Sequence, residues 1–536
     1  MKKTKKELTL TETIYEFLRK STLSYIVFAI VVFFIKICCT LALIPITYLP
    51  LVFKGLASCV GLIKGGIYAI SFNMLDQFHV LYHPIYYKFM KKTNNEKKVQ
   101  KGNDNDTQEK ATLTKKAKIN KEFEKIRKKK IQGSEGAKGT GLFAGIKRSL
   151  RSVVSHLPFL HNSPKVRSIE DLVIKKGYPL EHHTVETEDG HYLRLFRIPS
   201  SPKYDDGKQN GTNKRKPVAF FMHGLLTCGT IFVVEKALAL QLADQGYDIW
   251  LGNGRGGHNS QKHRDYDRED DRFWSHNFDD TVQYDFPSMV NFILDKTGQE
   301  KLNYFGFSQG SSQGFAAFSK FPEMNQKCNL FVGLAPTAIV NPIHTVAFKV
   351  ICAFPARFQR LLFGNKSIFE GVERTMRDLM SPKIYALAIR AAIWFLFGFN
   401  TKQLNNRGFD NVCQTLYSPQ STNLVIQWFQ QVKNEGFKYF DYEDEEKNLK
   451  VYGKKTPPDY DLSNIKCPVA LIAGNADPIP NMKALFEYGL DPQLVVKDLR
   501  IDGYEHLDIL FAHGSQEKVY DPVIELMNKH NFEDKN

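Results

Sequence analysis

The sequence lacks the features of several common protein classes. Its 536 residues include eight cysteines, and the five that follow residue 60 are widely scattered with no close pair. Disulfide-stabilised domains have dense cysteines at short spacings, so the pattern argues against a disulfide framework, although it is compatible with one buried bridge. Zinc-finger, homeodomain and RNA-binding signatures are also missing, so we expect no nucleic-acid partner.

Most of the chain also lacks an excess of positive charge. The formal net charge is +16, but residues 91–151 alone hold nineteen Lys and Arg against seven Asp and Glu. Residues 152–536 are slightly acidic overall. A basic segment that follows an apolar one indicates contact with anionic lipid rather than with nucleic acid.

Charge is nearly absent from residues 24–53, where Lys36 is the only charged residue. About 20 apolar residues in a helix cross the hydrocarbon core of a bilayer, so this run is long enough to span one. A weaker apolar run, residues 55–75, follows it. We therefore predict a membrane anchor over residues 24–75, as a single span or a hairpin. A cleaved signal peptide would be shorter, and a buried core helix would carry more charge.

Basic residues flank the predicted anchor on both sides. They lie in the tail, residues 1–23, and in the Lys-rich segment 76–167, which we expect to be a largely disordered linker. Its basic stretch 118–130 is either a solvated charge run or a contact with the membrane surface. Because Lys and Arg mark the cytoplasmic side, the pattern favours a hairpin with the following domain in the cytosol. Such a hairpin suits a lipid droplet, the endoplasmic reticulum or the plasma membrane.

Three asparagines stand in N-x-S/T sequons. They would be glycosylated only in a lumenal segment, and they are equally compatible with chance matches. They are Asn105, Asn210 and Asn365.

The pattern changes at residue 168. Between 168 and 336, short apolar strands alternate with helical stretches, and an Asp189-Gly190 turn predicts a β-hairpin. This alternation is typical of a parallel sheet covered by helices on both faces. Residues 337–465 read as mainly helical and rich in Phe, Leu, Ile and Ala, and a strand pattern returns in 466–536. We predict a helical cap inserted into one α/β core.

The motif Gly306-Phe307-Ser308-Gln309-Gly310 follows an apolar strand and precedes a helix. That context is required of a nucleophile elbow, in which a serine stands on a tight strand-to-helix turn and glycines permit close backbone approach. Without this context, G-x-S-x-G is a weak pattern and fits any Gly-rich turn. In this position it predicts that Ser308 is a catalytic nucleophile in an α/β-hydrolase fold.

A serine hydroxyl needs a base to take its proton. In the α/β-hydrolase order the acid and then the histidine follow the serine. Asp477 follows a predicted strand in GNADPIP, and His506 lies near the C-terminus in GYEHLDILF. The rival histidines are less suitable, because His513 lies seven residues further on, whereas His223 and His258 precede the serine.

An ester hydrolase also needs donors for the oxyanion. The segment His223-Gly224-Leu225-Leu226 ends a predicted strand, where an oxyanion loop belongs. We predict that the backbone N–H groups of Leu225 and Gln309 form the oxyanion hole.

Several blocks of the chain resemble the acid lipase family of gastric and lysosomal lipases, and within it the fungal membrane-anchored steryl ester hydrolases. The family's triad maps onto Ser308, Asp477 and His506, and its oxyanion donors map onto Leu225 and Gln309. Three features depart from the family: a glycine-rich GNGRGG loop, one glycine before the acid, and an apolar anchor where secreted members have a signal. The resembling blocks are residues 177–199, 223–226, 250–257, 273–287, 306–310, 333–336 and 506–508.

The resemblance implies hydrolysis of a neutral-lipid ester without metal or cofactor. We expect a steryl ester to be the substrate, with sterol and fatty acid as products. The Phe-rich stretches 346–363 and 385–399 either line an apolar tunnel or are ordinary packed helices. A triacylglycerol lipase of the same fold is the main alternative, and a catalytically silent lipid-binding or tethering protein is a more distant one.

Overall fold

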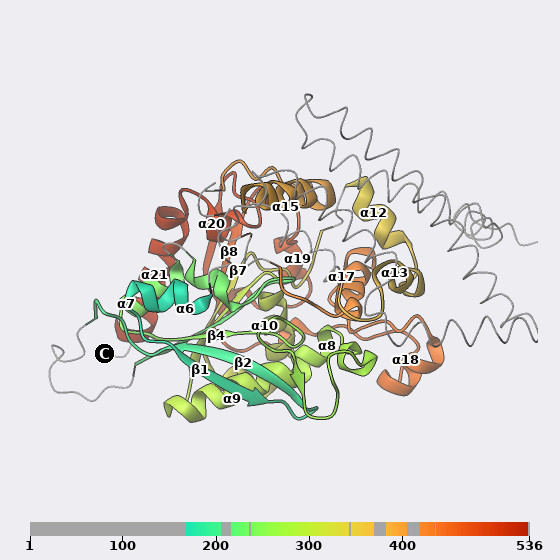
Figure 1. Cartoon of the computed structure of the whole chain (residues 1–536), viewed down its shortest axis with the longest axis horizontal. Helices are drawn as coiled ribbons and strands as arrows, with labels where there is room; N and C mark the ends of the chain where they lie inside the picture. The colour runs from blue at the N-terminus through green and yellow to red at the C-terminus, as the bar shows by residue number, and fades with distance from the viewer. Residues whose placement is uncertain are drawn as a thin grey trace, which may run out of the picture. The chain divides into compact units, whose positions relative to one another are not determined.

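The structure is a computed structural model of the whole chain (Figure 1). The residues that it describes are 168–204, 216–234, 237–341, 345–368, 382–404, 409, 413, 417–434 and 436–533. The predicted tail, anchor and linker, together with Asn105 and Asn210, lie outside these residues. Asn365 is described and is exposed. Among the described helices, none combines the length and apolar character that crossing a bilayer requires.

A mixed β-sheet runs through the described chain. The strands lie in the order β1-β2-β4-β3-β6-β7-β8-β9, and β5 pairs with β2. The predicted hairpin is present, since β1 and β2 are antiparallel on either side of the Asp189-Gly190 turn. From β4 to β9 all neighbouring strands are parallel. The strands are β1 Glu181–Glu186, β2 His191–Ile198, β3 Val218–Met222, β4 Asp248–Gly252, β5 Lys262–His263, β6 Leu302–Phe307, β7 Cys328–Leu334, β8 Val469–Gly474 and β9 Val495–Ile501.

Both faces of the sheet are covered by helices, and every residue of the central strands β3, β6 and β8 is buried. Successive residues of a strand point to opposite faces. Phe221 of β3 therefore packs in the core of one face and Phe220 in the core of the other. The first core includes α6 Ile169–Val173, α7 Leu238–Asp244, α20 Asp508–Phe511 and α21 Asp521–Asn528. The second includes α9 Phe286–Thr297, α10 Gln309–Lys320, α11 Pro322–Gln326 and α19 Met482–Glu487.

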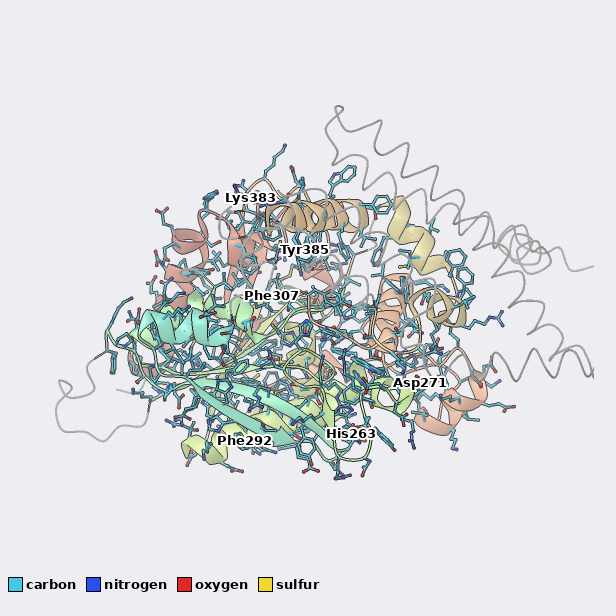
Figure 2. All side chains as sticks on the ribbon, viewed as in Figure 1. His263, Asp271, Phe292, Phe307, Lys383 and Tyr385 are labelled. Atoms are coloured by element: carbon cyan, nitrogen blue, oxygen red, sulfur yellow. The ribbon has the colours of Figure 1, made fainter. Side chains whose placement is uncertain are left out.

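The described residues between β7 and β8 are mainly helical, as the composition of residues 337–465 predicted. On α15, Lys383 is exposed and Tyr385 is buried (Figure 2). Phe348, Val425 and Phe429 form a small core of their own. The helices of this segment are α12 Val346–Ala353, α13 Ala356–Phe363, α15 Pro382–Phe397, α17 Thr422–Asn434 and α18 Glu445–Tyr452.

The cysteines in the described residues form no disulfide. All five are buried. They are Cys228, Cys328, Cys352, Cys413 and Cys467.

Candidate active site

Ser308 stands at the sharp turn between β6 and α10. Its backbone has φ 53° and ψ −120°, a conformation that L-residues other than glycine rarely adopt. The N–H of Ser308 donates to the carbonyl of Leu334 at the end of β7, at 2.9 Å. The turn is thus tied to the neighbouring strand and presents the serine at the carboxyl end of the sheet.

The two glycines of the motif allow this turn to pack closely. A Cβ at Gly310 would lie 2.2 Å from the carbonyl oxygen of Met222, the last residue of β3. A Cβ at Gly306 would lie 2.5 Å from the carbonyl oxygen of Gly310. Both contacts involve backbone atoms, which cannot rotate away, so each position requires glycine.

His506 and Asp477 come together with Ser308, although they lie far apart in the chain. The Ser308 hydroxyl is 2.8 Å from His506 Nε2. His506 Nδ1 is 2.7 Å from a carboxylate oxygen of Asp477, whose other oxygen accepts from the Ile479 N–H at 3.0 Å. Asp477 and His506 are 8% and 5% exposed. The three side chains form a continuous hydrogen-bonded line from hydroxyl to imidazole to carboxylate.

Two aromatic rings and a carboxylate position the His506 loop. The ring of Phe399 stacks on the imidazole with the centroids 5.9 Å apart, and Phe307, labelled in Figure 2, lies 5.5 Å away. Beside the histidine, the Glu505 carboxylate accepts from the Asn400 N–H at 2.7 Å. Phe399 and Asn400 follow α15, so the helical segment contacts the catalytic loop directly.

Asp508 makes a hydrogen bond within the loop that carries His506. One of its oxygens accepts from the Glu505 N–H at 2.7 Å, and the other has no hydrogen-bond partner among the described residues. Burial raises the pKa of Asp508 to about 6, because the low-polarity surroundings disfavour the charged form.

The predicted oxyanion loop is held by side chains that the sequence did not single out for this role. The carbonyl of Gly224 accepts from the Thr227 hydroxyl and lies against His223 Nδ1, each at 2.8 Å. His223 Nε2 accepts from the Gly254 N–H at 3.0 Å, so Nδ1 must carry the proton and donate. Burial lowers the pKa of His223 to about 4, which keeps the ring neutral. Because the Gly224 carbonyl and the Leu225 N–H belong to one peptide group, these bonds also orient the Leu225 N–H.

Gln309 is the first residue of α10, where a helix N–H has no intrahelical acceptor. Its side-chain oxygen accepts from the Trp428 indole N–H at 2.8 Å. The Cβ of Ser308 lies 3.0 Å from the position of a Cβ built on Gly224, so the serine and the oxyanion loop are close neighbours. The predicted donors thus flank Ser308 on two different elements.

The other candidate histidines have different surroundings. His223 belongs to the oxyanion loop, as described above, and His513 and His258 are exposed. The backbone N–H of His513 donates to Gln403, and that of His258 donates to the Ser418 hydroxyl.

The glycine-rich loop after β4 is anchored by a buried ion-pair network. Arg255 is 1% exposed, and its guanidinium donates to Asp285 at 2.6 Å and to Asp189 at 2.6 Å. These carboxylates raise the pKa of Arg255, so it stays charged despite its burial. The neighbouring Gly254 N–H donates to His223, so the ion pairs of Arg255 also hold the backbone that supports the His223 ring. The GNGRGG loop, which departs from the family pattern, is therefore held in place by the ion pairs of its own Arg255.

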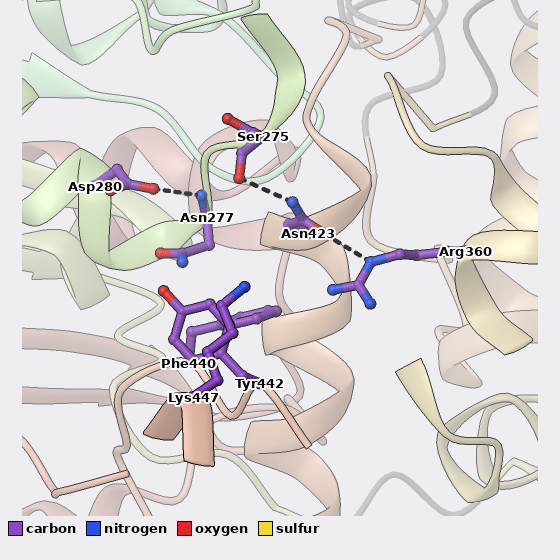
Figure 3. A pocket seen from close by; sticks show the side chains of 8 residues that line it. All are labelled: Ser275, Asn277, Asp280, Arg360, Asn423, Phe440, Tyr442 and Lys447. Carbon is purple, nitrogen blue, oxygen red and sulfur yellow. Dashed lines mark hydrogen bonds between the residues drawn. The ribbon is translucent and has the colours of Figure 1, made fainter. Parts of the chain in front are cut away.

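A polar cavity of about 480 Å³ lies elsewhere, between the loop before α8 (Phe278–Asp280) and the helical segment (Figure 3). Asn423 bridges its two sides, since it donates to the Ser275 carbonyl and accepts from Arg360. None of its lining residues belongs to the Ser308 site. They are Ser275, Asn277, Asp280, Arg360, Asn423, Phe440, Tyr442 and Lys447. Within the described part of the chain, no cluster of three His, Cys, Asp or Glu side chains is arranged to hold a metal ion.

Comparison with known proteins adds independent evidence. A family profile described as "Partial alpha/beta-hydrolase lipase region" matches residues 169–236, and one described as "alpha/beta hydrolase fold" matches 217–373. The gastric triacylglycerol lipase of Rattus norvegicus is 34% identical over 372 residues, which are 67% of this chain and 91% of the rat protein. The chain belongs to the acid lipase family.

Two further relatives support this assignment. The human lysosomal acid lipase/cholesteryl ester hydrolase is 32% identical over 372 residues, 68% of this chain and 91% of the human protein. A fungal relative, "Probable lipase C16A3.12c" of Schizosaccharomyces pombe, is 33% identical over 376 residues, 69% of this chain and 81% of that protein. As an acid lipase, the protein is a carboxylic ester hydrolase with an α/β-hydrolase fold.

Proposed function

We propose that this acid lipase cleaves its ester with Ser308 as nucleophile, His506 as general base and Asp477 as the acid that orients the imidazole. The single observation that supports this assignment best is the unbroken hydrogen-bonded line of the three side chains at a strained turn. Strain is tolerated at such turns because it exposes the hydroxyl above the sheet.

The geometry suggests the order of steps. Ser308 attacks the ester carbonyl while His506 Nε2 takes its proton, and Asp477 stabilises the imidazolium that forms. The Leu225 and Gln309 N–H groups hold the oxyanion of the tetrahedral intermediate. His506 then donates its proton to the leaving alcohol, and water resolves the acyl-enzyme by the same groups in reverse roles.

We propose a steryl ester as the principal substrate. The human relative is named a cholesteryl ester hydrolase, and the blocks of resemblance point to the fungal steryl ester hydrolases. The gastric relatives are named triacylglycerol lipases, so triacylglycerol is the second candidate. The two substrates share the acyl ester and differ in the alcohol.

We further propose that residues 24–75 anchor the enzyme in an intracellular membrane or lipid droplet, with residues 76–167 as linker and the catalytic domain in the cytosol. Residues 168–336 and 466–536 would form the core, and residues 337–465 the cap. Four apolar side chains on the cap helices are about half exposed or more, which suits a lipid surface. They are Val350 49%, Leu361 67%, Leu387 49% and Trp394 63%.

The nucleophile is tested by Ser308→Ala in the full-length protein. We expect ester hydrolysis and labelling by a fluorophosphonate probe to disappear while the melting temperature is unchanged. Hydrolysis that persists in this variant would refute the assignment.

Substrate and location need separate experiments. Release of fatty acid from cholesteryl oleate should exceed release from triolein in emulsions of matched surface area, and the reverse ranking would favour a triacylglycerol lipase. A fluorescently tagged chain should localise to membranes or droplets, and a chain lacking residues 1–90 should not. Protease protection of residues 168–533 in sealed microsomes would contradict the cytosolic orientation.

A further inference from the structure

Residues 417–434 of the helical segment contact both sides of the proposed oxyanion hole. This stretch comprises a short segment without regular secondary structure, residues 417–421, followed by α17. It is fixed to the core by Ser421, whose hydroxyl lies 2.7 Å from the carbonyl oxygens of Trp274 and His276. The α17 side chain of Gln427 also accepts from the Phe278 N–H at 3.0 Å. The stretch is therefore an anchored part of the molecule.

On the first side, α17 holds the residue after the nucleophile. The Trp428 indole N–H donates to Gln309 Oε1 at 2.8 Å. Gln309 is 6% exposed, so its amide oxygen is largely withdrawn from water and depends on this donor. A fixed Gln309 side chain restricts the rotation of the backbone to which it is attached.

On the second side, the same stretch holds the loop that carries Leu225. The Ser418 N–H donates to the carbonyl of Leu226 at 2.8 Å. Leu226 has φ 57°, a left-handed conformation that is unfavourable for leucine and persists only where surrounding contacts impose it. The side chains of Leu225 and Leu226 pack against the core that includes Val425 and Phe429.

We propose that Trp428 and Ser418 are positioning residues for catalysis, so that the segment between β7 and β8 completes the oxyanion hole and does more than cover it. The inference rests on the proposed function, in which Leu225 and Gln309 supply the oxyanion donors. Neither Trp428 nor Ser418 needs to touch the substrate, because each acts through a neighbouring residue.

The physical basis is geometric. Donors stabilise an oxyanion only when they already point at the place where its charge develops. A donor that is free to turn away must be reoriented in each turnover, and this lowers kcat while substrate binding is little affected. Loss of a hydrogen bond that only positions a donor should therefore lower kcat less than removal of the donor itself.

The test is Trp428→Phe in the full-length protein, assayed with a water-soluble short-chain p-nitrophenyl ester. We expect kcat to fall about three- to tenfold with KM nearly unchanged. The affinity for a trifluoromethyl ketone, which forms an oxyanion adduct with the serine, should fall by the same factor.

Tyr247→Phe is the matched control. The buried side chain of Tyr247 also loses a hydrogen bond in this substitution, since its hydroxyl donates to Asn528 Oδ1 at 3.2 Å, at the amino end of β4. We expect the control to alter the melting temperature as much as Trp428→Phe does, and to leave kcat and ketone affinity unchanged.

Gln309→Met removes the same hydrogen bond from its other end and keeps the backbone N–H. If the bond is the route of the effect, this variant should match Trp428→Phe, and the double variant should be no worse than either. Unchanged kcat in both single variants, or a loss of stability without loss of ketone affinity, would overturn the proposal. Retained activity in Ser308→Ala would instead refute the proposed function itself.

Discussion

The turn that carries Ser308 and the loop that carries Leu225 lie side by side, but they are held in different ways. The serine turn is fixed by backbone atoms: two glycines without side chains, a strained φ, and a hydrogen bond to Leu334. The oxyanion loop is fixed by side chains, namely His223 and Thr227 from its own strand end and loop, and by contacts with the helical segment.

This difference indicates which part of the site can vary. A turn built from backbone tolerates no added atom, so its sequence pattern is short and recognisable. A loop supported by side chains can be adjusted through residues far away in the chain. Substitutions should therefore abolish function at the turn and only reduce it at the loop.

The largest effect is expected from Gly310→Ala. The added methyl group would lie 2.2 Å from the Met222 carbonyl oxygen, so either β3 or α10 must move. We expect activity to fall more than a hundredfold and the free energy of unfolding to fall by about 3 kcal/mol. Chemical denaturation and ester hydrolysis measure both quantities.

Gly453→Ala is a control for the glycine change itself. Gly453 has φ 69°, and a Cβ there would meet nothing within 4 Å. The Gly453→Ala substitution should lower the free energy of unfolding by only about 1 kcal/mol, because alanine is less favourable than glycine in a left-handed backbone, and activity should be normal. Equal activity in the Gly310 and Gly453 variants would contradict the close-packing argument.

An intermediate effect is expected from His223→Ala. The substitution removes a donor to the Gly224 carbonyl and leaves the Gly254 N–H without its acceptor. We expect kcat to fall about ten- to thirtyfold with a destabilisation of about 1–3 kcal/mol. His223→Asn, whose amide can still donate to Gly224, should recover part of the loss in kcat. Equal kcat in the two variants would show that the donor is unimportant.

A smaller effect is expected from Thr227→Val, which is nearly isosteric. The Gly224 carbonyl loses the hydroxyl donor but keeps His223, so kcat should fall about two- to threefold. Combining Thr227→Val with His223→Ala should reduce kcat by more than the product of the single effects, since Gly224 then has neither donor. Simple multiplication of the two effects would argue that they act independently.

The smallest expected effect concerns the junction between the core and the helical segment. Asp279 of α8 accepts from Gln427, Tyr460 and the Phe440 N–H, and burial raises its pKa to about 6 from an ordinary value of 3.8. The folded protein then binds this proton more tightly than the unfolded chain, so its contribution to stability is greatest at acid pH and declines as pH rises from about 4 to 6.

The neutral histidine His223 has the opposite pH dependence, because its folded pKa of about 4 lies below the ordinary 6.5. Its contribution is present above pH 6.5 and is lost as the pH falls towards 4.

His223 is present in both the wild type and Asp279→Asn, so only Asp279 makes the two proteins differ. We expect the melting temperature of the wild type minus that of Asp279→Asn to increase as the pH is lowered from 7 to 4. A difference that stays constant with pH would show that Asp279 does not titrate in this range.

The sequence predicted the parts of the site that depend on local pattern. The strand–turn–helix context identified Ser308, and chain order identified Asp477 and His506, which the structure brings within hydrogen-bonding distance. The parallel strands were predicted correctly from the succession of strand and helix patterns, and the hairpin from alternating apolar residues around the Asp189-Gly190 turn. The serine turn and the hairpin are each encoded by a short run of neighbouring residues, whereas Asp477 and His506 were found from their order along the chain.

The remaining features could not be predicted, because they depend on contacts between distant residues. His223 looked like a rival base, and only the fold shows that its ring bonds to Gly254 and Gly224. The contact between Trp428 and Gln309 joins residues 119 positions apart. The antiparallel pairing of β2 with β4 likewise depends on the sheet as a whole.

The site is assembled from strands on either side of the helical segment, and this has a consequence for biosynthesis. Ser308 leaves the ribosome early, whereas Asp477 and His506 follow β8 and β9, after the whole inserted segment. A nascent chain therefore holds a serine hydroxyl without its catalytic base until β8 emerges and pairs with β7 and β9 then pairs with β8. The order in which its parts are made thus keeps the enzyme inert until β8 and β9 have been synthesised.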